Sequence, residues 1–96
     1  MIRATYEGKE IANSDKTIFL EGNHYFPEAA VEKSFLKESD HHTTCPWKGL
    51  AYYYHILGAE LSENAAWYYP EPKEAAKEIT GYIAFDTRYV NVEEVK

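Results

Sequence analysis

The residues best suited to chemistry lie in one short segment, Thr43-Thr44-Cys45-Pro46-Trp47-Lys48-Gly49, which holds the only cysteine of the chain. Lys48 is the only Lys or Arg between Lys37 and Lys73. A lysine set among aromatic and aliphatic residues is suited to holding the negative charge of a ligand, because low local polarity strengthens its attraction. The same residues also fit a plain turn, in which Lys48 has no such role.

Both interpretations keep the same turn. Pro46 fixes φ at its second position, and Gly49 lets the chain leave in a left-handed conformation. In the structural interpretation, Cys45 is a small buried hydrophobe and Trp47 is a core ring. In the functional interpretation, Lys48 points into an aromatic pocket. That pocket is lined by Trp47, Tyr53, Trp67 and Tyr69.

Cys45 is the candidate nucleophile for an enzyme, either a hydrolase or a transferase. Lys48 lies three residues on and would lower the pKa of the thiol, and His41 or His42 would serve as the base. Lys48 itself is the other candidate catalytic group. The proline after Cys45 and the lack of a second cysteine argue against redox cycling.

A metal site is a weaker interpretation of the same region. Asp40, His41, His42 and Cys45 offer hard and soft ligands within six residues. Adjacent histidines point apart in an extended chain, and a second pair of ligands is missing. The sequence therefore predicts no bound metal and no cofactor.

Composition limits the classes of partner. Sixteen Asp and Glu against ten Lys and Arg give a net charge of −6, which repels nucleic acid and anionic lipid. No apolar run approaches the length of a membrane span, and residues 1–6 lack the apolar stretch of a signal peptide. One cysteine excludes an internal disulfide. We expect a cytoplasmic protein that binds neither nucleic acid nor membranes.

Short apolar runs separated by Gly, Pro, Asn and Asp favour strands over long helices. A chain of 96 residues can bury enough surface for only one hydrophobic core, so we expect residues 1–96 to form a single domain. The prediction is a mainly β fold, a small antiparallel barrel or two-sheet fold with at most one or two short helices. Strands are expected at residues 2–6, 10–12, 17–20, 31–36, 50–57, 65–69, 79–85 and 89–92, and a short helix at 72–78.

Tyrosines dominate the expected strand at residues 50–57. Alternation places Tyr53 on one face and Tyr52 and Tyr54 on the other, so both faces are substantially apolar. Such a strand is central in a sheet, or its second face is covered by a loop or a partner. This favours a third class of function, an interaction module or homodimer that uses the strand from Tyr52 to Tyr54.

Three blocks of the chain together resemble one known family, the domain-of-unknown-function family numbered 427. They are Thr44-Cys45-Pro46-Trp47-Lys48-Gly49-Leu50-Ala51-Tyr52-Tyr53, Ala65-Ala66-Trp67-Tyr68-Tyr69-Pro70-Glu71-Pro72 and Ile79-Thr80-Gly81-Tyr82-Ile83-Ala84-Phe85. The resemblance covers nearly the whole chain. It implies a compact, mostly β domain with no established biochemical role.

The family is sometimes labelled nucleotidyltransferase-like. Such enzymes hold catalytic metals with closely spaced carboxylates, and this chain has no Asp-x-Asp or Asp-x-Glu. Where the family commonly has Asp before its Ala-Ala-Trp step, this chain has Asn64. The leading hypothesis from sequence is therefore an uncharacterised domain that binds a small anionic or planar ligand, anchored by Lys48.

Overall fold

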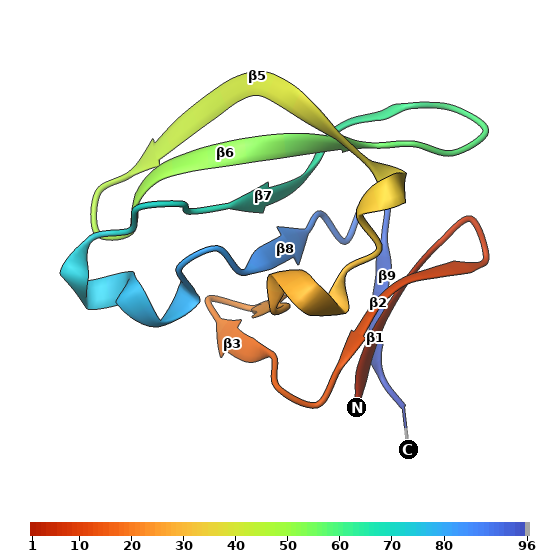
Figure 1. Cartoon of the computed structure of the whole chain (residues 1–96), viewed down its shortest axis with the longest axis horizontal. Helices are drawn as coiled ribbons and strands as arrows, with labels where there is room; N and C mark the ends of the chain where they lie inside the picture. Colours follow the sequence, from red (N-terminus) through yellow and green to blue (C-terminus); the bar gives the residue numbers. More distant parts are fainter. Residues whose placement is uncertain (96) are drawn as a thin grey trace.

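The computed structural model describes residues 1–95, which form nine antiparallel strands in three sheets, joined by turns and short 3-10 helices (Figure 1). The first sheet has the order β2-β1-β9, the second β3-β4 and the third β5-β6-β7-β8. The prediction of a small, mainly β, antiparallel fold is confirmed.

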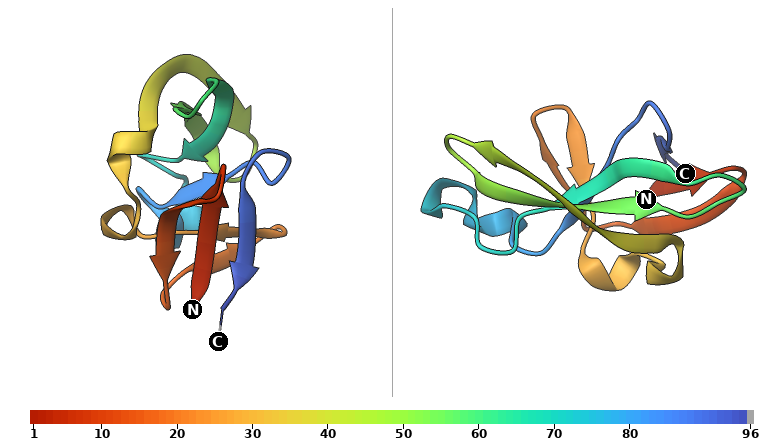
Figure 2. Two further views of the ribbon diagram at one scale, coloured as in Figure 1. Left: turned by 90° about the vertical axis from the view of Figure 1, so that its right-hand side faces the viewer. Right: turned by 90° about the horizontal axis from the view of Figure 1, so that it is seen from above.

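The first sheet joins the two ends of the chain. Strand β1 (Ile2–Tyr6) pairs with β2 (Lys9–Ser14) on one side and with β9 (Asn91–Glu94) on the other, which the left view of Figure 2 shows. Glu7 and Gly8 connect β1 to β2 with φ of 51° and 78°. Two consecutive positive φ values match the twist of a tight hairpin, which explains the glycine.

The second sheet is a hairpin of the same kind. Strand β3 (Ile18–Leu20) pairs with β4 (Asn23–Tyr25) through Glu21 and Gly22, whose φ values are 51° and 82°. The sequence analysis did not predict strand β4. That strand has only three residues, and its Asn and His are weak strand formers.

The third sheet forms the long upper layer of Figure 1. It contains β5 (Leu36–Cys45), β6 (Gly49–Ile56), β7 (Ser62–Tyr68) and β8 (Ile83–Phe85). Both neighbours of β6 are bulged. Residues 39–41 of β5 stand opposite Tyr53 alone, and residues 63–65 of β7 stand opposite His55 alone. Bulges of this size bend a strand, and β5 arches over the sheet.

The strand predicted at residues 31–36 is wrong. Residues Lys33–Phe35 form a 3-10 helix, and Val31 makes only an isolated bridge to Ala12. The strand begins at Leu36 instead and continues to Cys45, through a segment in which the sequence analysis expected no strand. Most of its side chains are exposed and polar because it lies at a sheet edge, so it lacks the alternation that identifies a half-buried strand.

The helix predicted at residues 72–78 is a 3-10 helix at Glu74–Ile79, interrupted by Ala76 with φ of −123°. A third 3-10 helix spans Glu28–Ala30. The strand predicted at 79–85 is limited to Ile83–Phe85, because the chain first turns at Gly81 with φ of 73°. Apolar residues before that turn serve the core without joining the sheet.

Alternation along β6 and β7 divides the hydrophobic core into two clusters. Tyr54, Ile56, Ala66 and Tyr68 form what we term the core face, which belongs to a cluster with Phe26 and Phe85 and with apolar residues of β1 and β2. Ala51, Tyr53, Trp67 and Ala84 form the cleft face, which packs with Tyr25, Tyr69 and Ile79. The sequence prediction that both faces carry apolar residues is therefore confirmed.

Candidate functional site

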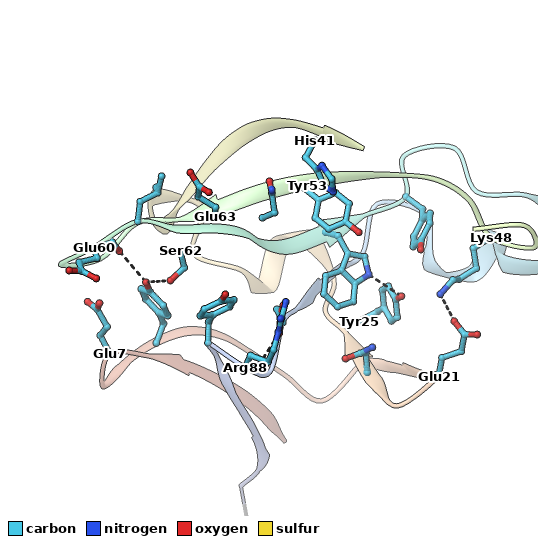
Figure 3. A pocket seen from close by; sticks show the side chains of 18 residues that line it. Glu7, Glu21, Tyr25, His41, Lys48, Tyr53, Glu60, Ser62, Glu63 and Arg88 are labelled. Atoms are coloured by element: carbon cyan, nitrogen blue, oxygen red, sulfur yellow. Dashed lines mark hydrogen bonds and ion pairs between the residues drawn. The ribbon is translucent and has the colours of Figure 1, made fainter. Parts of the chain in front are cut away.

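A cleft of about 1010 Å³ runs along the cleft face, from the β1–β2 turn at one end to the β3–β4 turn at the other (Figure 3). Glu7, Glu60 and Glu63 lie at the first end, and Lys48 lies with Glu21 at the second. Residues from distant parts of the sequence thus meet in one hollow. We take this cleft as the candidate site.

The two bulges supply part of the lining. The bulge in β5 directs His41 over the cleft, where its ring contacts Tyr53 with 4.8 Å between centroids. The bulge in β7 brings Glu63 and Asn64 into the lining. Bulges are common beside functional sites because the extra residue re-aims side chains that regular pairing would turn elsewhere.

Asn64 connects the two bulges. Its side-chain oxygen accepts a hydrogen bond of 2.5 Å from the Ser39 hydroxyl, and its backbone N–H donates to His55 Nδ1 at 3.0 Å. Asn64 also adopts φ of 52°. The non-glycine residues with positive φ in the described chain are Glu7, Glu21 and Asn64, and all three line the cleft. Unfavourable backbone conformations of this kind are enriched at functional sites.

Tyr53 and Trp67 form an aromatic wall in the middle of the cleft. Their ring centroids are 6.3 Å apart, and both side chains are half-buried. Trp67 Nε1 donates a hydrogen bond to the hydroxyl of Tyr25 at 3.2 Å, and the Tyr53 hydroxyl is bonded to Thr43 Oγ1 at 2.9 Å. Both rings are therefore held in place at their polar atoms while part of their surface faces the cleft.

Lys48 is buried, with 7% of its surface exposed. Its ammonium donates to the Glu21 carboxylate and lies 5.5 Å from the Trp47 ring and 5.4 Å from the Tyr69 ring. Burial by itself would lower the pKa of Lys48, but the hydrogen bond to Glu21, together with the charge of Glu21 and the nearby hydroxyls of Tyr25 and Tyr69, outweighs burial and holds the pKa above its ordinary value. The same bond lowers the pKa of Glu21. Lys48 is thus a permanent cation that already has a partner.

The second cation of the cleft is also paired. Arg88 lies on the other side of the cleft from His41 and Tyr53, in the segment that follows β8 (Figure 3). Its Nη2 donates to Asp86 Oδ2 at 2.7 Å and its Nε to Oδ1 at 3.1 Å. These hydrogen bonds hold the pKa of Asp86 below its usual value.

The first end of the cleft is acidic. Glu7 accepts a hydrogen bond from the backbone N–H of Ala59 at 2.9 Å, and the hydroxyl of Tyr6 is bonded to Ser62 Oγ at 2.6 Å. Within residues 1–95, Glu7, Glu60 and Glu63 form no ion pair with Lys or Arg. The whole lining contains five carboxylates, which outnumber Lys48 and Arg88. The cleft as a whole therefore carries negative charge.

The structure brings together most of the residues predicted from sequence. Lys48, Tyr53, Trp67 and Tyr69 all line the cleft. Trp47 does not line it: its side chain is 37% exposed, and its Nε1 donates to Glu21 at 3.3 Å from outside. Trp47 thus supports the ion pair rather than the wall.

The candidate nucleophile and metal ligands do not come together. Cys45 ends β5 opposite Gly49, and no hydrogen bond joins it to a histidine in residues 1–95. His41 packs on Tyr53 and His42 on Tyr52, whose side chains point to opposite faces of β6. In the same residues, no three His, Cys, Asp or Glu side chains are grouped to hold a metal ion.

Sequence reasoning missed the acidic residues of the cleft. The residues that the sequence analysis grouped around Lys48 include no carboxylate. The signal was the repeated Glu-Gly pair, which places a carboxylate at the tip of each of two hairpins. That signal gives the local turn, but it does not show that the two tips reach opposite ends of one cleft.

Comparison with known proteins identifies the family. The family described as "Domain of unknown function (DUF427)" matches residues 1–96, the whole chain, so the chain belongs to it, as the sequence motifs predicted. No curated protein matches the chain. Within residues 1–95, every helix is too short to cross a lipid bilayer.

Proposed function

We propose that this member of the DUF427 family binds a small molecule that contains a ring, the face of which packs against the wall of Tyr53 and Trp67. The observation that carries the proposal is this wall, whose half-buried rings are fixed by hydrogen bonds and face a cleft large enough for a ligand. Sites for small molecules are concave, include aromatic side chains and contain a few polar groups that set orientation.

The charge of the cleft bears on the anionic ligand predicted from sequence. An anion would have to share Lys48 with Glu21, and it would enter a lining in which carboxylates outnumber cations. Like charges raise the free energy of binding, most strongly where water is scarce. The charge balance therefore argues against the anionic ligand of the sequence hypothesis and leaves a ligand without negative charge.

The two alternatives from the sequence draw less support from the geometry. An enzyme that uses Cys45 needs a base within reach, and the histidine that faces the cleft, His41, packs on Tyr53 instead. An interaction module built on Tyr52 and Tyr54 needs free rings, but both lie against Tyr68, with centroids 5.8 and 5.0 Å away. The geometry therefore supports ligand binding in the cleft better than either alternative.

The test is a binding screen that covers several ring chemistries. Nucleosides, aromatic acids, aromatic amines and neutral saccharides would be added to the protein, and the melting temperature and tryptophan fluorescence measured. A ligand at one hundred times its Kd adds about 2.7 kcal/mol of stability, which is easily detected. We expect at least one class to raise the melting temperature of the wild type.

The two tryptophans provide a matched control. Trp67→Phe removes part of the wall, whereas Trp47→Phe changes a ring outside the cleft. The proposed function requires that Trp67→Phe weaken binding and that Trp47→Phe leave it nearly unchanged. If no ring compound stabilised the wild type, or if both variants bound equally well, the cleft would not be a ligand site.

A further inference from the structure

We infer that the ligand of the cleft is a neutral saccharide longer than one sugar ring. The inference rests on the proposed function, and it names the chemical class that the lining favours. It is carried by the kinds of side chain in the cleft, by the pairing of its charges and by its size.

The lining combines many rings with almost no aliphatic surface. Five tyrosines, Trp67 and His41 contribute rings, and Leu61 is the one aliphatic side chain among the described residues that line it. Typical pockets for drug-like molecules are instead mostly hydrophobic. A sugar has a face of C–H groups that packs on an aromatic ring and an edge of hydroxyls that needs hydrogen-bond partners. A lining of rings and polar groups fits both requirements.

The charges favour a neutral ring at the wall. Anions are disfavoured by the excess of carboxylates. A cationic ring stacked on Tyr53 would lie between Arg88 and Lys48, whereas the unpaired carboxylates that could attract it lie at the acidic end of the cleft (Figure 3). Because Glu21 and Asp86 already satisfy these two cations, the centre of the cleft presents paired charges rather than a free one. A neutral ligand leaves both pairs intact.

The polar groups are held ready for hydroxyl groups. The fork between Arg88 and Asp86 leaves carboxylate lone pairs as acceptors and other guanidinium N–H groups as donors. Ser39 occupies the side-chain oxygen of Asn64, so the amide NH₂ remains to donate. Groups fixed before the ligand arrives lose little conformational entropy on binding. Donors and acceptors in alternation suit hydroxyls, which act as both.

The size of the cleft argues for more than one sugar ring. Its volume of about 1010 Å³ stands at the upper end of pockets that hold drug-sized molecules, which are roughly 300–1,000 Å³. The acidic end, with Glu7, Glu60 and Glu63, lies beyond the aromatic wall (Figure 3). A single ring at the wall would leave that end empty, whereas an oligosaccharide would extend into it.

The experiment uses maltotriose, cellotriose and chitotriose (the N-acetylated form) as probes with the full chain. Aromatic protons of the protein are saturated in an NMR experiment, and the transfer of saturation to sugar C–H protons is measured. We expect transfer from at least one trisaccharide, with weaker binding of the matching monosaccharide and little change with added NaCl, because neutral ligands are not screened by salt.

Three variants complete the test. Trp67→Phe should weaken binding by about three- to tenfold, in line with the worth of an aromatic contact. Arg88→Gln, at an exposed side chain, should weaken binding without unfolding the domain, which keeps the test valid if Trp67 variants are unstable. Trp47→Phe should bind as the wild type does.

The other outcomes contradict either the saccharide inference alone or the proposed function as well. If aromatic acids or amines bind at the wall and the trisaccharides do not, the saccharide inference fails while the proposed function stands. If a trisaccharide binds but Trp67→Phe and Arg88→Gln have no effect, the sugar lies elsewhere and the inference also fails. If no ring compound of any class binds, the proposed function fails and the inference fails with it.

Discussion

The two faces of β6 and β7 carry the same kinds of residue and serve different ends. On the core face, Tyr54 and Tyr68 stack with centroids 5.0 Å apart and planes inclined by 22°. On the cleft face, Tyr53 and Trp67 are 6.3 Å apart and inclined by 42°. Tyr53 and Trp67 are directly opposite each other on β6 and β7, whereas Tyr54 and Tyr68 are diagonal cross-strand neighbours.

The difference between the faces lies in what covers them. Sheet residues of β1 and β2, together with Phe26 and Phe85, close the core face. The cleft face is covered at one end by Tyr25, Tyr69 and Ile79, and the rest remains open as the cleft. An aromatic pair in a strand therefore does not by itself predict a binding site. Whether such a pair lines a binding site or packs into the core depends on the elements that pack opposite it.

The largest effect expected is on the core face. Ile56 is completely buried, and Ile56→Ala should reduce the free energy of unfolding by about 2–5 kcal/mol, through lost contacts and a cavity. Tyr53→Phe on the cleft face should cost about 1 kcal/mol or less, because it removes only the hydroxyl bonded to Thr43. Urea unfolding measures both.

A particular result would remove the distinction between the faces. If Tyr53→Phe cost as much as Ile56→Ala, the cleft face would be packed core rather than the wall of a site. Leu57→Ala, at a side chain 38% exposed beside Ile56, is the control for generic loss of apolar surface and should have a small effect.

The second prediction concerns the turn that carries Lys48 to the cleft. Gly49 has φ of 112°, and a Cβ there would lie 3.5–3.6 Å from backbone atoms of residues 71–73. Gly49→Val should therefore cost about 2–3 kcal/mol, because a β-branched residue is strained at positive φ. Thermal melting gives the comparison with Lys48→Met.

Lys48→Met should cost less, about 1 kcal/mol or below. The methionine retains the packed stem, and the Glu21 side chain left behind is 50% exposed and stays solvated. A loss as large as that of Gly49→Val would show that Lys48 is a structural ion-pair partner first, and the cleft end would then belong to the core.

The third prediction separates the faces by pH. Burial raises the pKa of Tyr68, on the core face, to about 12. The folded state thus favours the protonated phenol. Its contribution to stability is complete below the unfolded pKa near 10 and is lost as the pH rises towards 12. Because the Tyr68 side chain is only half-buried, solvent screening reduces the expected loss to about 1 kcal/mol.

Unfolding by urea between pH 9 and 12 measures this loss. Tyr68→Phe removes the titrating group, so the fall in stability over that window should be smaller by the same amount, about 1 kcal/mol. An identical pH profile for wild type and Tyr68→Phe would contradict the burial of this hydroxyl and weaken the description of the core face as closed.

The fold was predictable where local rules decide it. The Glu7-Gly8 and Glu21-Gly22 turns and the strand at residues 2–6 follow from turn chemistry and apolar runs, and the structure has them. Strand β5 was missed because its exposed edge is polar, and a strand defined by its neighbour rather than by its own residues leaves little pattern.

The candidate site was predictable only in part. Trp67, Tyr53, Tyr69 and Lys48 could be grouped because aromatic residues around a lone lysine are visible in the sequence. The partner of Lys48 could not be found, because Glu21 is 27 residues away and reaches it through the packing of one hairpin tip against another. Long-range charge pairing of this kind depends on tertiary structure and leaves no local signal.

The smallest effect expected concerns the ion pair of Lys48 with Glu21. It tests the sequence hypothesis that Lys48 anchors an anionic ligand. In the wild type, the ammonium of Lys48 is already hydrogen-bonded to the Glu21 carboxylate, so inorganic phosphate should bind weakly. Glu21→Gln keeps the length of the side chain and removes its charge, which frees Lys48. We expect phosphate affinity to rise by about two- to fivefold, the size of one partly exposed charge contact. Adding Lys48→Met to Glu21→Gln should abolish the gain in phosphate affinity.

The opposite result would be a wild type that binds phosphate well, a Lys48→Met variant that does not bind it, and a Glu21→Gln variant with no gain in affinity. Lys48 would then anchor anions despite its ion pair with Glu21. The cleft face would then be an anion site, and the contrast with the core face would be one of charge as well as of cover.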